Sequence, residues 1–114
     1  MKPPEEKIVE VTCSGDMAEI TVSVGQLFCH WWTRHGSVGV DKKFTIIDEA
    51  IVALEDSDCE YLYPERLKPG WTGGDKERCK WVFKALKKGT TEIIFHDIFR
   101  FEVEDECTLK VRVE

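Results

Sequence analysis

The sequence predicts an all-β domain, an immunoglobulin-like antiparallel β-sandwich of about seven strands. Two observations lead to this prediction. Short segments in which apolar and polar residues alternate recur along the chain, and Gly, Pro and charged turn residues separate them. Such a series of short strands is typical of a sandwich, in which each strand turns one face to the core. The Cys…Trp…Cys framework of antibody domains is not present, so we expect a sandwich of another kind.

The expected strands differ in how clearly they are marked. Alternation is cleanest at the C-terminal end, where Thr108, Lys110 and Arg112 would point outward. Residues 18–24 are rich in β-branched side chains, which favour strands. Residues 48–54 fit either one helical turn or a strand, and the pattern does not decide between them. The expected strands are residues 8–12, 18–24, 26–33, 43–47, 59–63, 79–85, 91–95 and 107–113.

The stretch CKWVFKALKKGTTEIIF, residues 79–95, has two competing interpretations. Residues 83–88 have helix-forming propensity, and a helix there would end at Gly89. As strands, Cys79, Trp81, Phe83 and Ala85 share one face, and a turn at residues 87–90 leads to a second strand. A lone helix in an all-β domain would have nothing on which to pack its apolar stripe, so a hairpin is favoured.

Length and charge limit the classes of function. A chain of 114 residues suggests one domain, spanning residues 8–114, after a polar and Pro-containing N-terminal tail of residues 1–7. The net charge of -6 argues against a nucleic-acid partner, which would need a basic face. No apolar run has the length of a membrane span, so no membrane contact is expected. The first residues include no apolar leader segment, which predicts a cytoplasmic protein, with secretion open if a leader has been removed.

Five cysteines, at positions 13, 29, 59, 79 and 107, form no CxxC pair. Cys79 and Cys107 share strand parity with apolar neighbours, which predicts small buried side chains with free thiols. A disulfide framework is the alternative.

No arrangement of residues predicts catalysis or a resident ion. Cys29 and His30 are adjacent on an expected strand and would point to opposite faces, so they cannot act as nucleophile and base. Together with His35 they also lack any recognised spacing of metal ligands. We therefore expect a protein that is not an enzyme and that has no metal site and no cofactor.

The segment GGDKERCKWVFKALKKGTTEIIF, residues 73–95, resembles the signature of the chagasin family of cysteine-peptidase inhibitors. The similarity extends to AEITVSVGQLF at residues 18–28, YLYPERLKPGWTGG at residues 61–74 and CTLKVRVE at the C-terminus. The resemblance implies a sandwich that inhibits papain-like cysteine peptidases reversibly and without covalent chemistry. Three loops at one end would fill the active-site cleft, and the protein would act as a monomer.

The resemblance assigns these loops one by one. Residues 35–40 stand where the family has Asn-Pro-Thr-Thr-Gly followed by an aromatic residue, and they retain the glycine and a small hydroxyl. Residues 70–74 match the Gly-rich second loop, and residues 97–99 replace Arg-Pro-Trp but retain an aromatic side chain. The implied peptidase-binding residues are Ser37, Val38, Gly39, Val40, Trp71, Thr72, Gly73, Gly74, Asp97, Ile98 and Phe99.

Two aromatic residues of this set have a second interpretation. Trp71 is either an exposed anchor for a partner or a cap on the end of the core. Phe99 belongs to the alternating residues Phe99, Phe101 and Val103, which also fit a simple extension of a hairpin. The alternative function is a non-inhibitory protein-interaction domain of immunoglobulin-like fold that has the sandwich without the inhibitory loops.

Overall fold

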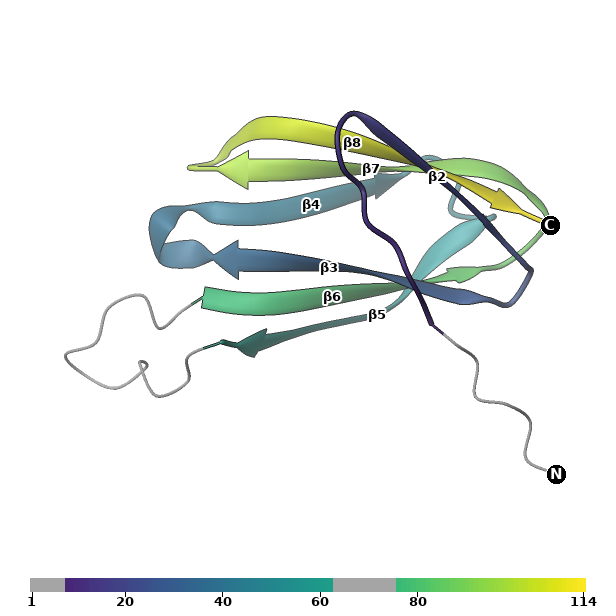
Figure 1. Cartoon of the computed structure of the whole chain (residues 1–114), viewed down its shortest axis with the longest axis horizontal. Helices are drawn as coiled ribbons and strands as arrows, with labels where there is room; N and C mark the ends of the chain where they lie inside the picture. Colours follow the sequence, from purple (N-terminus) through teal and green to yellow (C-terminus); the bar gives the residue numbers. More distant parts are fainter. Residues whose placement is uncertain (1–7, 63–75) are drawn as a thin grey trace, which may run out of the picture.

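The computed structural model describes residues 8–62 and 76–114, which form eight β-strands and one short 3₁₀ turn (Figure 1). No helix in this part of the chain is long and apolar enough to cross a membrane. The expected tail at residues 1–7 lies outside the described residues. The elements are β1 (Val9–Glu10), β2 (Met17–Val22), β3 (Leu27–His35), η1 (Gly36–Val38), β4 (Val40–Ile46), β5 (Val52–Tyr61), β6 (Lys76–Ala85), β7 (Gly89–Phe99) and β8 (Glu102–Val113).

The strands form two layers of four. One layer has the order β2-β8-β7-β4, and the other has β3 paired with both β1 and β6, followed by β5. A single pair of residues, His35 and Val40, connects the two layers across the β3–β4 turn. Figure 1 shows β8, β7 and β4 together above β3, β6 and β5. The predicted sandwich is thus confirmed, with eight strands and with two parallel pairs, β1–β3 and β2–β8, among the antiparallel ones.

Aromatic rings from both layers meet in the core. Phe95 of β7 stacks on His30 of β3 with 4.3 Å between ring centroids. Phe44 of β4 meets Trp81 and Phe83 of β6 edge-on, at 4.7 and 5.2 Å. Burial of such large apolar rings is the main favourable contribution to folding, and the mixed stacked and edge-on geometry is the one aromatic pairs prefer.

The hairpin predicted for residues 79–95 is confirmed. Cys79, Trp81, Phe83 and Ala85 are buried on one face of β6, and Thr91, Ile93 and Phe95 are buried on one face of β7. The undecided segment 48–54 begins as a turn, in which Asp48 Oδ1 accepts a hydrogen bond from the Ala50 amide, and continues as β5. Asp48 is itself fixed by its amide, which donates to buried Thr91 Oγ1 over 2.9 Å.

Strand β5 forms one edge of the sandwich. Its register against β6 shifts between Leu54 and Asp56, which is a β-bulge. From Leu54 to its end the side chains of β5 are exposed, and four of them are carboxylates: Glu55, Asp56, Asp58 and Glu60.

The expectation of free thiols at Cys79 and Cys107 was wrong. Both side chains are buried as expected, but Cys79 is bonded to Cys59 and Cys107 is bonded to Cys13. The cause is strand register. Cys59 and Cys79 lie directly opposite each other on β5 and β6, and opposite residues of neighbouring strands are close enough to bond. The second bond ties β8 to the segment that connects β1 with β2.

Candidate functional site

The β3–β4 turn is the first of the three predicted loops. Residues Gly36–Val38 form the 3₁₀ turn, and the amide of Gly39 donates to the carbonyl oxygen of Gly36 over 3.1 Å. Gly39 has φ of +79°, in the left-handed region that favours glycine. Ser37 and Val38 are both exposed. The turn therefore exposes the apolar side chain of Val38, and its backbone conformation depends on Gly39.

The β3–β4 turn rests against the β7–β8 hairpin. The amide of Arg100 donates to the carbonyl oxygen of Gly39 over 2.8 Å. A Cβ atom at Gly39 would lie only 3.0 Å from the Arg100 nitrogen, so the close approach requires glycine. Just beyond, Val40 of β4 pairs with Phe99 of β7. Two of the three predicted loops thus form one continuous surface at one end of the sandwich (Figure 1).

The β7–β8 hairpin differs from the expectation. Asp97, Ile98 and Phe99 were expected in a loop, but they are the last residues of β7 and pair with β4 and β8. The turn itself consists of Arg100 and Phe101, and both have positive φ, 51° and 71°. Two consecutive positive φ values are typical of a type I′ turn, which ordinarily contains Asn-Gly or similar residues. Arg100 and Phe101 are not residues that mark such a turn.

Phe101 is the residue of this end that the sequence-based assignment missed. Its side chain is 100% exposed, whereas that of Phe99 is 39% exposed and has the Arg100 guanidinium 5.1 Å from its ring centroid. A large apolar side chain that is fully exposed at a strained turn is unusual for a purely structural position. The apolar residues Phe99, Phe101 and Val103 alternate with polar ones. This alternation continues across the turn, so the pattern suggests one unbroken strand and does not mark Phe101 as a turn residue.

A cavity of about 230 Å³ lies between the two turns. Gly36, Gly39 and Val40 contribute one side, and Ile98 and Phe101 contribute the other. These residues include members of both the first and the third predicted loop, so the two sets meet around one depression.

The second predicted loop, Trp71, Thr72, Gly73 and Gly74, lies outside the described residues. The strands on either side of it are described. β5 ends at Tyr61, and β6 begins at Lys76, which pairs with His35 directly before the β3–β4 turn. Figure 1 shows the end of β5 and the start of β6 at the same end of the molecule as the two turns.

Two ion pairs connect these strand ends with the first turn. The guanidinium of Arg34 lies 3.9 Å from a carboxylate oxygen of Glu77 on β6 and 3.9 Å from one of Asp41 on β4. Ion pairs at such exposed positions contribute little to stability. Their role here is positional, since they join the β3–β4 turn to the strand that follows the second loop.

A chain of polar side chains leads from buried His30 in the core to exposed Asp97 at the same end. Nδ1 of His30 lies 3.0 Å from the carbonyl oxygen of Val11, which can only accept, so Nδ1 carries the proton. Nε2 therefore accepts from the Lys42 ammonium at 2.8 Å, and this ammonium lies 3.5 Å from Asp97. Burial, and next the charge of Lys42, lower the pKa of His30, which favours the neutral ring at neutral pH.

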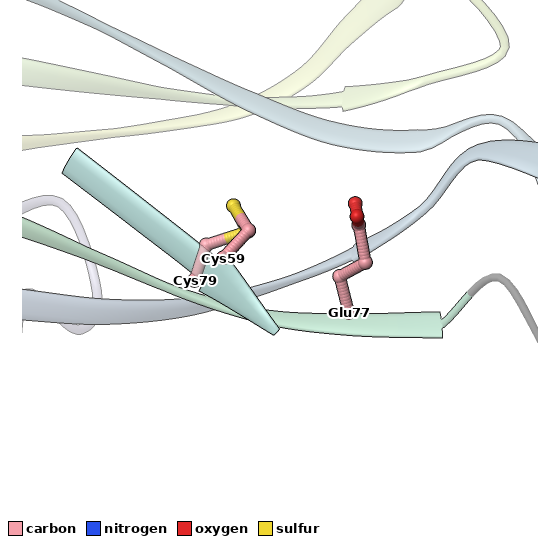
Figure 2. Close-up of side chains that lie close together, drawn as sticks. All are labelled: Cys59, Glu77 and Cys79. Atoms are coloured by element: carbon pink, nitrogen blue, oxygen red, sulfur yellow. A yellow bond between two sulfur atoms is a disulfide. The ribbon is translucent and has the colours of Figure 1, made fainter. Parts of the chain in front are cut away.

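One group of metal-ligand residue types occurs among the described residues: Cys59, Glu77 and Cys79 (Figure 2). Both sulfur atoms belong to the disulfide, which leaves no thiolate to bind an ion. The remaining cysteine, Cys29, is buried, and burial raises the pKa of its thiol. A buried thiol with a raised pKa is a poor nucleophile.

The comparisons with known proteins find likeness in structure. No family model and no curated protein sequence matches the chain. The crystal structure of the cysteine protease inhibitor EhICP2 from Entamoeba histolytica is similar with a TM-score of 0.75 and 19% identity, over 98% of this chain and 100% of that one. The chain has the fold of this inhibitor.

Two further structures share the fold. PbICP-C, solved in complex with falcipain-2, is similar with a TM-score of 0.59 and 12% identity, over 100% of this chain and 96% of that one. The solution structure of Amebosin is similar with a TM-score of 0.55 and 16% identity, over 89% of this chain and 100% of that one. The architecture expected from the resemblance to the chagasin family is thus confirmed.

Proposed function

We propose that this protein is a reversible, non-covalent inhibitor of papain-like cysteine peptidases that fills the active-site cleft with loops from one end of the sandwich. The observation that supports this most is the contact between Gly39 and Arg100, which joins two of the three predicted loops into one surface. The fold shared with cysteine protease inhibitors, one of them solved in complex with falcipain-2, supports the same assignment.

The chemistry of this end suits a protein partner. Val38, Phe99 and Phe101 are exposed apolar side chains in or directly beside the two adjoining turns. Aromatic side chains at the centre of an interface commonly contribute 2 kcal/mol or more, roughly, to binding. The Gly39–Arg100 hydrogen bond joins the two turns before binding, which reduces the entropy lost on association.

Within this proposal, the binding residues fall into three groups. Ser37, Val38, Gly39 and Val40 form the first contact region, with Trp71, Thr72, Gly73 and Gly74 as the second. The third is the hairpin end, in which we add Arg100 and Phe101 to the expected Asp97, Ile98 and Phe99. The tip that enters the cleft is Phe101, since the β-ladder holds the backbone of residues 97–99 back from the turn.

The test is a titration of the protein against papain and a cathepsin-L-like peptidase, with hydrolysis of a fluorogenic peptide as the readout. We expect stoichiometric or nanomolar inhibition that is reversed by dilution. Leu86→Ala is a suitable control, because Leu86 is also exposed but lies in the β6–β7 turn, at the opposite end of the strands. If the folded protein at micromolar concentration leaves both enzymes active, the inhibitor assignment is wrong and a non-inhibitory interaction domain replaces it.

A further inference from the structure

The two disulfides differ in their access to solvent. Cys59 is exposed on the edge strand β5, and its partner Cys79 is buried. In the other bond Cys13 is half-buried and Cys107 is buried. Exchange requires a thiolate to approach one sulfur atom in line with the bond, so the exposed bond is the reactive one.

The Cys59–Cys79 bond also lies next to the proposed binding end. Beyond it, β5 and β6 pair at only two more positions, which end with Tyr61 opposite Glu77. Tyr61 and Glu77 line a cavity of about 200 Å³ together with Arg34 and Gly36 of the β3–β4 turn. Among the described residues β6 is the only strand that pairs with β5, and this disulfide cross-links the two strands close to the described end of β5.

We propose that Cys59–Cys79 is a site of thiol–disulfide exchange that sets the inhibitory strength of this end of the molecule. The co-reactant is a dithiol reductant. Its thiolate attacks Cys59 Sγ, a mixed disulfide forms, and Cys79 leaves and takes up a proton. The second thiol of the reductant then attacks the reductant sulfur that is bonded to Cys59 Sγ, and Cys59 is released as a thiol. The protein gains two electrons and two protons, and the reductant becomes a cyclic disulfide.

Glu77 controls how fast the exchange runs. Its carboxylate and the two sulfur atoms of the disulfide lie close together, with ligand atoms within 4.8 Å of one another (Figure 2). Its ion pair with Arg34, over 3.9 Å, reduces but does not cancel the negative charge of Glu77, which repels an incoming thiolate and disfavours the departing one. The bond is therefore accessible, but its reduction by small anionic thiols is slow.

The link to inhibition rests on the proposed function. The bond joins residues 20 apart in sequence, so it closes a covalent ring that includes residues 60–78. Opening the ring removes a constraint on both strand ends beside the first turn, and ordering them again on binding costs free energy. We expect the reduced protein to inhibit roughly tenfold more weakly than the oxidised one.

The exchange is tested first without a peptidase. The oxidised protein is incubated with rising concentrations of dithiothreitol, trapped with iodoacetamide, and mapped by mass spectrometry. We expect Cys59 and Cys79 to be labelled at lower concentrations than Cys13 and Cys107. Glu77→Gln should speed reduction by glutathione, whereas Glu92→Gln, on the other layer, should not. Labelling of Cys13 and Cys107 first, or of all four together, would overturn the proposal.

The effect on inhibition is measured with an activated peptidase freed of thiols by desalting. The C59S/C79S variant should be weaker than the wild type, and C13S/C107S should not be weaker in the same way. If C59S/C79S is unfolded by circular dichroism, wild-type protein reduced and alkylated at these two positions replaces it. Equal inhibition by the open and closed forms refutes the regulation, whereas absence of inhibition by every form refutes the proposed function instead.

Discussion

The ammonium of Lys42 lies 2.8 Å from Nε2 of His30, and the other nitrogen of the same ring faces the carbonyl oxygen of Val11. The ring is thus held neutral between a cation and a backbone acceptor. Asp97, 3.5 Å from the ammonium, is the one carboxylate that the structure pairs with Lys42 in the described residues. The three side chains come from β3, β4 and β7. Because the folded protein lowers the pKa of His30, we expect the stability of the sandwich to depend on pH.

Stability should fall as the pH falls below about 6.5, the ordinary pKa of histidine. Burial and the charge of Lys42 lower the pKa of folded His30, so the unfolded chain takes up this proton first, and unfolding is favoured until the pH reaches the lower, folded pKa. The slope from this residue is at most about 1.4 kcal/mol per pH unit. The measurement is urea unfolding of wild type and His30→Gln between pH 5 and 8. A difference between the two that does not change with pH would contradict the assignment.

Lys42→Met should raise the pKa of His30. The substitution removes the neighbouring positive charge, which is the second cause of the lowered pKa after burial. The pKa is followed by NMR titration of the ring protons, with Lys43→Met as the control, because Lys43 is exposed and on the other face of β4. A titration of His30 that Lys42→Met leaves unchanged would show that burial alone accounts for the shift.

Gly39→Ala should destabilise the protein by more than Gly15→Ala does. Both glycines have similar positive φ, +79° and +71°, but a Cβ atom meets nothing within 4 Å at Gly15 and meets the Arg100 backbone at 3.0 Å at Gly39. The strain of positive φ, about 1–2 kcal/mol, is common to both. Thermal unfolding of the two variants therefore isolates the contact between the turns. Equal losses would mean that the β7–β8 turn moves away at little cost.

Replacement of Arg100-Phe101 by Asn-Gly should stabilise the fold and weaken inhibition. Both native residues have positive φ, which Asn-Gly adopts readily, so we expect a gain of about 1 kcal/mol. The variant also loses the exposed aromatic tip, and inhibition should weaken at least roughly tenfold. The two readouts are the unfolding free energy and the inhibition constant. A variant that gains stability and inhibits as well as the wild type would exclude Phe101 from the site.

Trp71→Ala should weaken inhibition at least roughly tenfold if this side chain is an anchor in the cleft. The same substitution would instead lower the unfolding free energy, with inhibition changed only in proportion to the folded fraction, if Trp71 caps the core. Inhibition constants measured on fully folded variant protein separate the two cases. Leu86→Ala is again the matched control for loss of an exposed apolar side chain.

The parts of the fold that the sequence predicted are those in which one strand face is buried. Phe83 and Phe95 alternate with polar residues because one side of each strand meets the opposite layer, and this periodicity is visible without coordinates. Segment 48–54 was undecided because it combines two structures. Residues 48–51 form a turn, and residues 52–54 begin strand β5. The disulfides were missed because they depend on the register between β5 and β6 and on how the β1–β2 connection meets β8.

The turns at the candidate site were located only in part, for a related reason. The first loop was assigned from the resemblance to the chagasin family, and Gly36 and Gly39 mark a turn at the same place. The third was placed two residues too early, since the turn at Arg100 and Phe101 contains neither Gly nor Asn and the apolar alternation continues across it. Local propensity does not predict a turn at residues that disfavour turns. The turn at Arg100 is instead held by tertiary contacts, such as the hydrogen bond from the Arg100 amide to the Gly39 carbonyl oxygen.

The carboxylates along β5 affect whether copies of the protein associate with one another at high concentration. An inhibitor that binds one to one has to reach at least the concentration of its target, and at such concentrations an open sheet edge invites strand addition between copies. Glu55, Asp56, Asp58 and Glu60 place like charges along that edge, and the bulge at Leu54 and Asp56 interrupts its regular spacing. If the β5 strands of two copies came together, the carboxylates of one would repel those of the other. The exposed edge that leads to the binding end therefore resists self-assembly.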